Sequence, residues 1–311
     1  MAGSVLIVGA GAIGAFYGGV LARAGCDVSV VARSDYDAVA RDGFRVASTI
    51  GDLSFRPRKV LRAAEGEFDI VFVALKLTRG VDRVAMIRPA LGPGTAIVLV
   101  VNGIDVEQEV AEAFPGHELL SGVAYAAASR EAPGHVRHHS QYTRLILGRY
   151  PSGASETADR LAELLKKGGS SCQVVEDIVG ARWMKCAWNT VFNPISAIGG
   201  GLGSKDMLAS GESVAFAHAA ISEVCAVAKA AGHPLPEDTA DKQIAGTQRM
   251  ANHVSSMGQD WLAGRPMETE AILGNAVRIA RRLQVPAPRL ESLYALLLMA
   301  ENRRRGPAEV A

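Results

Sequence analysis

The sequence predicts an α/β protein in which a mostly parallel sheet with covering helices is followed by an all-helical domain. Short apolar runs alternate with helical patterns through the first half of the chain, as they do in sheets built from repeated strand–helix–strand units. A glycine-rich turn joins the first strand-like run to the first helical pattern, and from Ile178 onward the pattern is almost wholly helical. We therefore expect one domain over residues 1–177 and a second, helical domain over residues 178–311.

The most specific motif lies near the N-terminus. An apolar run over residues 5–8 leads into Gly9-Ala10-Gly11-Ala12-Ile13-Gly14, and a helical pattern follows over residues 15–24. A second apolar run over residues 28–32 ends at Arg33. Strand, G-x-G-x-x-G, helix and strand in this order form the dinucleotide-binding fingerprint of Rossmann-type folds. We therefore expect the N-terminal domain to be a Rossmann-type dinucleotide-binding domain.

Each glycine of this motif has a physical role in such a fold. Gly9 permits a tight turn, Gly11 lets the backbone approach a pyrophosphate, and Gly14 lets the helix pack close to the strand. The free N–H groups at the start of the helix then face the anionic ligand. The cofactor-binding residues predicted for the turn are Gly9, Ala10, Gly11, Ala12, Ile13 and Gly14.

Arg33 indicates which form of the cofactor is bound. NAD-binding proteins usually carry Asp or Glu at this strand end, where the carboxylate accepts hydrogen bonds from the ribose 2′-hydroxyl. An arginine favours a 2′-phosphate instead, through charge-assisted contacts, and Ser34 beside it adds a hydroxyl. We therefore predict NADP(H) over NAD(H), with an ordinary surface arginine as the structural alternative.

Further strands and one helix are expected in the first domain. Residues 44–47 and 53–57 are candidate short strands, and residues 119–148 resemble a β-meander. Residues 156–167 have a helical pattern, and residues 171–175 read as a last strand. These elements complete the predicted sheet before the helical region begins.

Two apolar runs that read as buried parallel strands each end in a polar side chain. Residues 69–75 precede Lys76, and residues 95–101 precede Asn102. The carboxyl ends of parallel strands face the ligand crevice in open α/β sheets. Lys76 and Asn102 are therefore candidate binding residues, and ordinary loop polarity is the alternative for both.

Composition excludes several classes of protein. The net charge of +1 favours neither nucleic acid nor an anionic membrane surface. The stretch over residues 186–204 contains asparagines, proline and glycines, so it is too polar to span a bilayer. The four cysteines are scattered without a C-x-x-C pair, as in proteins of a reducing compartment. We therefore expect a cytoplasmic protein.

Three histidines lie close together in the chain, but we expect no metal site. On a strand, His135 and His139 share one face while His138 points to the other. No matching cluster of Asp, Glu or Cys accompanies them. Solvated or hydrogen-bonded histidines are the simpler interpretation.

A polar stripe crosses the apolar helical pattern of residues 182–194. Lys185, Asn189 and Asn193 follow one another at i, i+4 and i+8, so they lie on one side of a helix. A lysine on a buried helix is costly unless it is paired or faces a cleft, and burial can lower its pKa until it serves as a general acid. The alternative is that Lys185 extends to the surface while the asparagines cap or bridge helices.

A second polar segment lies farther along the chain. Residues 255–260 precede Glu268 and Glu270, which open a long amphipathic pattern. Acidic side chains in the first turn of a helix stabilise it through the helix dipole. This stabilising role is enough to explain the presence of either glutamate. The spacing of the residues alone does not indicate that Glu268 is catalytic.

Taken together, these residues resemble the ketopantoate reductase family (2-dehydropantoate 2-reductases) over essentially the whole chain. The lysine–asparagine–asparagine-proline helix combined with a distant serine and glutamate is the specific part of the likeness. The matching features are the turn Gly9–Gly14, Arg33, Lys76, Asn102-Gly103, Trp183-Met184-Lys185, Asn189, Asn193-Pro194, Ser255-Ser256-Met257 and Glu268.

The resemblance implies an NADPH-dependent reduction of a 2-keto acid, with ketopantoate as the leading candidate, to the 2-hydroxy acid, as in pantothenate biosynthesis. Lys185 would donate the proton to the developing alkoxide, and Glu268 would accept a hydrogen bond from a substrate hydroxyl and help to hold Lys185. The resemblance also implies that Asn102 lies near the nicotinamide and that Arg33 and Lys76 bind the 2′-phosphate. The implied substrate-binding residues are Asn102, Asn189, Asn193, Ser256 and Glu268. The expected partner is a small 2-keto acid, and the sequence leaves a homodimer open.

One loop departs from the family pattern. An asparagine that helps to hold the substrate is typical after the lysine helix, whereas this chain has a glycine-rich loop with Gly203 near that position. The reaction type is therefore better supported than the substrate. One alternative is a related reductase of another 2-keto acid, and a second is a non-catalytic NADP(H)-binding regulatory protein.

Overall fold

The computed structural model describes residues 3–139 and 143–305, which divide into two compact units. The sheet unit comprises the described residues up to Lys76 together with Asp82–Val101 and Val106–Val179. The helical unit comprises Leu77–Val81, Asn102–Asp105 and the described residues from Gly180 onward. Two short loops that follow strands of the sheet therefore group with the helices, and the sheet unit extends two residues beyond the expected boundary at 177.

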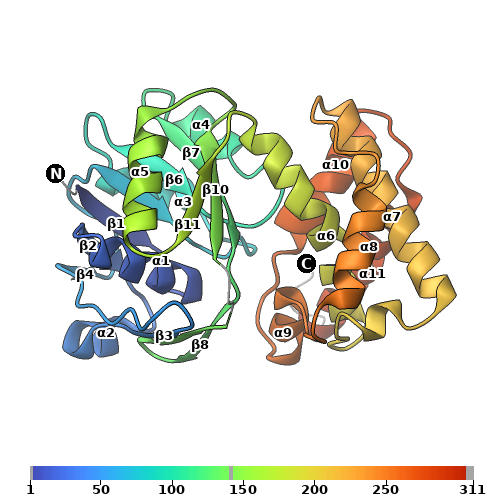
Figure 1. Ribbon diagram of the computed structural model, residues 1–311, viewed down its shortest axis with the longest axis horizontal. Helices are drawn as coiled ribbons and strands as arrows, with labels where there is room; N and C mark the ends of the chain where they lie inside the picture. The colour runs from blue at the N-terminus through green and yellow to red at the C-terminus, as the bar shows by residue number, and fades with distance from the viewer. Residues whose placement is uncertain (1–2, 140–142, 306–311) are drawn as a thin grey trace. The chain divides into compact units, whose positions relative to one another are not determined.

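The sheet unit is built on one eight-stranded sheet in the order β11-β10-β7-β6-β5-β1-β2-β4 (Figure 1). All neighbours pair in parallel except β7 and β10, which are antiparallel. The strands are β1 (Ser4–Val8), β2 (Asp27–Val31), β4 (Val60–Leu61), β5 (Ile70–Val73), β6 (Ala96–Leu99), β7 (Leu119–Tyr125), β10 (Arg144–Arg149) and β11 (Ser171–Val174). The predicted α/β class with a mostly parallel sheet is confirmed.

The order of the strands places the first turn of the chain at a switch point. From β1 the chain passes to β2 on one side and later to β5 on the other. Strands β5 and β6 are buried along their whole length, as expected for parallel strands covered on both faces. Because ligands of open α/β sheets bind at such a switch point, the loop after β1 is the natural binding position.

Helices and a small second sheet cover the main sheet. The helices are α1 (Ala12–Arg23), α2 (Tyr36–Asp42), α3 (Arg83–Ile87), η1 (Arg88–Ala90), α4 (Gln108–Ala113) and α5 (Glu156–Lys167). The second sheet has the order β3-β9-β8, with β3 (Arg45–Ser48), β9 (His135–His138) and β8 (Ala128–Ala132). Helix α1 contacts both α5 and this small sheet (Figure 1). His138 is buried there, stacked on Phe16 with the ring centroids 4.5 Å apart.

Two predicted strand regions differ from the structure. Residues 53–57 form no strand, since Phe55 makes only an isolated bridge to Phe44 and the edge strand β4 comes later. Pro57 explains part of this difference, because it has no N–H to donate to a sheet. Residues 119–148 form no single meander: β7 and β10 join the main sheet, while β8 and β9 join the small one.

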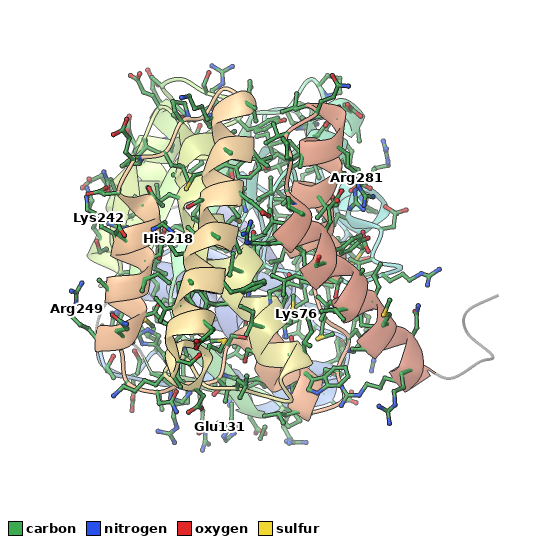
Figure 2. All side chains as sticks on the ribbon, turned by 90° about the vertical axis from the view of Figure 1, so that its right-hand side faces the viewer. Lys76, Glu131, His218, Lys242, Arg249 and Arg281 are labelled. Carbon is green, nitrogen blue, oxygen red and sulfur yellow. The ribbon has the colours of Figure 1, made fainter. Side chains whose placement is uncertain are left out.

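The helical unit confirms the predicted all-helical C-terminal part. Its elements are α6 (Ile178–Ile198), η2 (Asp206–Leu208), α7 (Gly211–Ala230), α8 (Thr239–Arg249), α9 (Ser256–Leu262), the π-helical turn η3 (Glu270–Gly274), α10 (Asn275–Arg282) and α11 (Pro288–Arg305). Helices α7 and α8 pack together. His218 of α7, which is labelled in Figure 2, has its Nε2 3.2 Å from Oδ1 of Asp241 on α8.

Helix α7 is apolar and long enough to cross a bilayer by length and composition alone, with a mean hydropathy of 1.3 over its most apolar window. It packs against α8, α10 and α11. A capping box at Ser210 and Ser213 begins the helix, and it carries the buried carboxylate of Glu223. These contacts bury part of α7 inside the helical unit.

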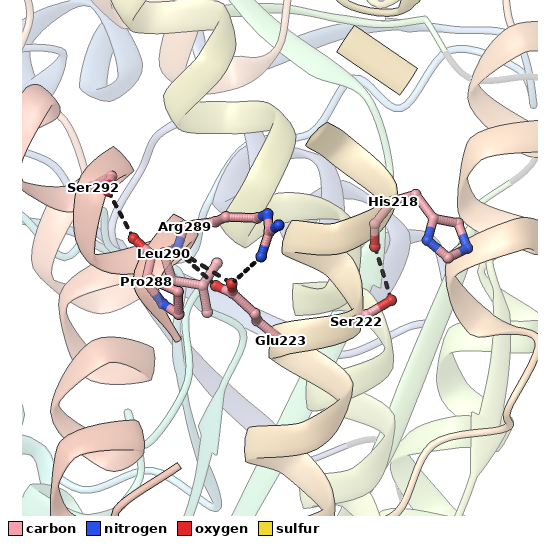
Figure 3. Close-up of polar contacts among 7 residues, drawn as sticks. All are labelled: His218, Ser222, Glu223, Pro288, Arg289, Leu290 and Ser292. Atoms are coloured by element: carbon pink, nitrogen blue, oxygen red, sulfur yellow. Dashed lines mark hydrogen bonds and ion pairs between the residues drawn. The ribbon is translucent and has the colours of Figure 1, made fainter. Parts of the chain in front are cut away.

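Glu223 links α7 to the start of α11. Its carboxylate is 8% exposed and accepts hydrogen bonds from the backbone N–H groups of Arg289 and Leu290, at 3.0 Å each (Figure 3). The guanidinium of Arg289 pairs with it as well, at 3.0 Å. The first N–H groups of a helix have no partner within the helix. Glu223 therefore supplies from α7 the cap that α11 lacks in its own sequence.

Glu223→Ala should lower the free energy of unfolding by about 2 kcal/mol, because buried N–H groups of α11 lose their acceptor. Urea unfolding followed by circular dichroism measures the change. Ser222→Ala is the matched control, since the neighbouring Ser222 is exposed and bonds only to His218 of its own helix (Figure 3). Equal stability of the two variants would rule out this role of Glu223.

Candidate functional site

The glycine motif forms the turn between β1 and α1. Gly9 has φ +106°, a conformation that side chains rarely adopt, and a Cβ there would lie 2.7 Å from the carbonyl oxygen of Ala74. A Cβ on Gly14 would overlap the carbonyl oxygen of Gly9. Beside Gly11, by contrast, no described atom lies within 4 Å of the Cβ position. Two glycines are therefore required for packing, and the third leaves space for a ligand.

That space borders the start of α1. Gly11 is the N-cap residue in an extended conformation, and no side chain caps the helix there. The N–H groups of its first turn, including those of Ala12 and Ile13, therefore suit an anion. The turn fits the pyrophosphate of a dinucleotide, with the backbone as the main source of contacts.

The two predicted cations of the sheet unit are both on its surface. Arg33 and Ser34 are exposed directly after Ala32, whose N–H bonds to Leu61 at the edge of the sheet. Lys76 is exposed and follows the end of β5. Exposed guanidinium and ammonium groups are suited to charge-assisted hydrogen bonds with an incoming phosphate.

Asn102, Lys185 and Glu268 form one hydrogen-bonded cluster in the helical unit. The ammonium of Lys185 donates to Oδ1 of Asn102 at 2.8 Å, and Nδ2 of Asn102 donates to Oε2 of Glu268 at 3.2 Å. Oε1 of Glu268 accepts the backbone N–H of Leu77 at 3.0 Å. Glu268 is only 5% exposed. The structure thus connects the lysine and the carboxylate through the amide between them.

Backbone contacts with the start of the amphipathic helix hold the loop that carries Asn102. Gly103 has φ +112°, and a Cβ there would overlap the carbonyl oxygen of Ala271. The same carbonyl accepts the N–H of Ile104 at 2.9 Å, and Asn275 donates to the carbonyl oxygen of Ile104 at 2.6 Å. Ala271 lies in η3, so a π-helical turn replaces the regular helix start expected there. Such turns change the helical hydrogen-bond pattern and are common at functional sites.

The environment of Lys185 changes its acidity. Burial lowers the pKa of its ammonium from 10.5 to about 8, and the nearby positive charge of Arg182 acts in the same direction. The negative charge of Glu268 opposes the change. Arg182 is itself buried and donates to the carbonyl oxygen of Gly103 at 3.1 Å. Lys185 can therefore both carry a positive charge and release a proton near neutral pH.

Asn189 and Asn193 lie on α6 one and two turns after Lys185, and both are buried. Neither side chain forms a hydrogen bond with any other described residue. The polar atoms of both amides nevertheless keep some exposed surface. Buried amides normally find partners. Their geometry therefore suits groups that bind a ligand.

The two neighbouring serines of the second polar segment have different environments. Ser255 is buried and caps α9 by accepting the N–H of Gly258 at 3.1 Å. Ser256 is exposed at the first position of α9, and the described residues offer its hydroxyl no hydrogen bond. The capping role therefore belongs to Ser255, which leaves Ser256 available for a ligand.

The glycine-rich loop has a packing reason. A Cβ on Gly203 would overlap Oδ1 of Asn252. That oxygen accepts the N–H of Lys205 at 2.9 Å, and Nδ2 of Asn252 donates to Asp206 at 3.2 Å. An amide from a distant part of the chain thus takes the space of the missing side chain, and both of its ends hold the loop.

Sequence reasoning missed two contributors to this site. Leu77 acts through its backbone N–H, which no side-chain pattern can indicate. Arg182 precedes Lys185 by almost one helical turn, so its position was a signal that the charge of Lys185 would be affected. The predicted residues Asn102, Lys185 and Glu268 are brought together, whereas Ser256 forms no hydrogen bond to any of them.

Comparison with known proteins assigns both parts of the chain. The family described as "Ketopantoate reductase PanE/ApbA" matches residues 5–152, and "Ketopantoate reductase PanE/ApbA C terminal" matches residues 177–301. The 2-dehydropantoate 2-reductase of Nostoc sp. is 31% identical over 309 residues, covering 96% of this chain and 95% of that protein. The crystal structure of 2-dehydropantoate 2-reductase from Methylococcus capsulatus is 47% identical with a TM-score of 0.92, covering 98% and 99%.

A more distant solved structure shares the fold. D-mandelate dehydrogenase in a ternary structure with NADH and anilino(oxo)acetate has a TM-score of 0.88 at 20% identity, covering 98% of this chain and 100% of that chain. That protein was solved with NADH, so the fold alone does not decide between NADH and NADPH. Side chains at the ribose must do so.

Proposed function

Because this chain belongs to the ketopantoate reductase family of oxidoreductases, we propose that it reduces ketopantoate to pantoate with NADPH, as in pantothenate biosynthesis. One observation carries the proposal: the ammonium of Lys185 is held by Asn102, and Asn102 is held by Glu268. A ligand-binding protein without activity needs the dinucleotide site but has no use for a proton donor fixed in this way.

The chemistry requires a donor at the substrate carbonyl. A bound NADPH would supply a hydride to the carbonyl carbon, and the electrons of the C=O bond then move to oxygen. In our proposal Lys185 stabilises this developing negative charge and gives the oxygen its proton. The products are the 2-hydroxy acid, NADP⁺ and a neutral lysine, which is reprotonated from water.

The other predicted site residues bind the reactants in this proposal. Asn189 and Asn193 orient the substrate through their unpaired amides, Ser256 binds its carboxylate, and Glu268 accepts its hydroxyl. The cofactor residues are Gly9, Ala10, Gly11, Ala12, Ile13 and Gly14 at the pyrophosphate, Arg33 and Lys76 at the 2′-phosphate, and Asn102 near the nicotinamide.

A second candidate function is the reduction of another 2-keto acid. The observation that favours it is Asn252, which fills the space beside Gly203 and has both ends of its amide engaged. A substrate contact typical of the family is therefore replaced by a contact within the protein. This difference affects substrate choice and leaves the proton donor in place.

Location and assembly are proposals as well. Cys26, Cys172, Cys186 and Cys225 are all free thiols, which agrees with a reducing compartment such as the cytoplasm. We also propose a homodimer as the state to be tested in solution.

The first prediction tests the substrate. The protein should oxidise NADPH faster with ketopantoate than with other branched or hydroxylated 2-keto acids, because Glu268 offers an acceptor to the ketopantoate hydroxyl. The steady-state loss of the absorbance of the NADPH nicotinamide measures the rates across the panel. A higher kcat/KM for a keto acid without a hydroxyl would favour the second candidate, and no turnover with any of them would exclude a reductase.

The second prediction tests the cofactor. The protein should bind NADPH more tightly than NADH, and Arg33→Asp should narrow or reverse that preference by about 1.5–3 kcal/mol, because a charged contact to the 2′-phosphate is lost. Quenching of tryptophan fluorescence gives both affinities. Arg41→Asp makes the same change of charge at another exposed arginine, which pairs with Asp42, and should leave the preference intact. Equal affinities of the wild type for the two cofactors would contradict this assignment.

The third prediction tests the proton donor. Lys185→Ala should lower kcat by about 10²–10⁴-fold while the Kd for NADPH changes little. The wild-type kcat/KM should fall as pH rises through about 8, because the ammonium with that pKa must be protonated to act as the acid. Lys185→Arg should keep a positive charge at this position. Its kcat/KM should not fall as pH rises through about 8, since a guanidinium stays protonated.

Lys229→Ala is the matched control for Lys185, because Lys229 is an exposed lysine in the last turn of α7. It should keep the wild-type kcat and pH profile. A near-normal kcat of Lys185→Ala on the best substrate would mean that the proton comes from another group.

A further inference from the structure

Arg130 of β8 lies beside the strand end that carries Arg33, although the two are far apart in sequence. Its Nη1 donates to Oγ of Ser34 at 3.1 Å and to Oδ1 of Asp35 at 2.5 Å. Ser34 directly follows Arg33. In a Rossmann-type fold the ribose of the adenosine lies at this strand end. The guanidinium of Arg130 is therefore hydrogen-bonded to the loop that meets the ribose.

Asp35 holds this arginine in place. Its carboxylate is 3% exposed and accepts hydrogen bonds from Oγ of Ser34 at 2.8 Å and from the N–H of Gly134 at 3.2 Å. The side chain of Arg130, by contrast, is 46% exposed. One end of the guanidinium is thus anchored in the protein, whereas its Nε and Nη2 groups bond to no other described residue.

We propose that Arg130 is a second arginine of the 2′-phosphate site and contributes, with Arg33, to the preference for NADP(H). The inference rests on the proposed use of NADP(H). Asp35 is buried and already accepts three donors, so it directs little negative charge at an incoming phosphate. Two guanidinium groups then face the dianion, and one of them is already oriented before binding, which reduces the entropy lost on association.

The competing explanation is purely structural: Arg130 would only tie β8 to the loop after β2. The two explanations differ in what they predict for a ligand with and without the 2′-phosphate. Adenosine 2′,5′-bisphosphate and 5′-AMP are such a pair of probes, and isothermal titration calorimetry measures their Kd values without any turnover.

Arg130→Ala should weaken binding of adenosine 2′,5′-bisphosphate about tenfold, the loss expected for one charge-assisted contact, and leave the Kd for 5′-AMP unchanged. The Kd of Arg130→Lys for the bisphosphate should lie between those of Arg130→Ala and the wild type, because lysine keeps the positive charge but lacks the forked geometry of arginine. Arg137→Ala is the matched control, since Arg137 lies on β9 of the same small sheet, is 52% exposed and pairs with Glu131. It should leave both Kd values unchanged.

Two results would overturn the inference. One is an unchanged Kd of Arg130→Ala for the bisphosphate, and the other is an equal loss for both probes, which fits the structural explanation. If Arg130→Ala does not fold by circular dichroism, Arg130→Gln serves in the same comparison. A wild type that binds both probes equally would contradict the NADP(H) proposal itself, whereas a preference retained by Arg130→Ala would contradict only the role of Arg130.

Discussion

The amide of Asn102 is the interaction on which the candidate site depends. It has one accepting and one donating end, and these meet the ammonium of Lys185 and the carboxylate of Glu268. Both charged groups are largely withdrawn from water, where an unpaired charge is strongly destabilising. The orientation of the amide is fixed, because reversing it would bring donor to donor and acceptor to acceptor. One neutral side chain therefore sets the position of two charged ones.

The backbone explains why that amide can be where it is. Asn102 belongs to a loop whose next residues bond to η3 through Ile104 and Asn275, and Gly103 permits the close approach. The carbonyl of Ala271, which lies within this π-helical turn, accepts the N–H of Ile104. The π-helical turn and the glycine are thus two parts of one arrangement. The irregular turn of the helix accompanies the contact that holds the loop carrying the amide.

The sequence predicts those features of the structure whose physical causes lie close together along the chain. Gly9 and Gly14 were predictable because a strand, a tight turn and a helix impose their requirements within ten residues. The stripe through Lys185 follows from helical periodicity alone. No spacing, however, connects Asn102 to Glu268 across 166 positions of sequence, so the role of Glu268 came from the family resemblance. The π-helical turn was not predictable either, because its contact with Ile104 comes from a loop that is far away in the sequence.

The acidity of Lys185 follows from the same balance of forces. Burial alone favours the neutral amine, and the positive charge of Arg182 strengthens that tendency, while Glu268 favours the ammonium. Burial without any partner would remove the proton before the substrate arrived. The amide of Asn102 gives the ammonium a neutral acceptor and bonds in turn to the carboxylate of Glu268. The resulting pKa of about 8 leaves the lysine mostly protonated near neutral pH and still able to give up its proton. An arginine at this position would stabilise a developing alkoxide but could not supply the proton, because its pKa is too high for transfer.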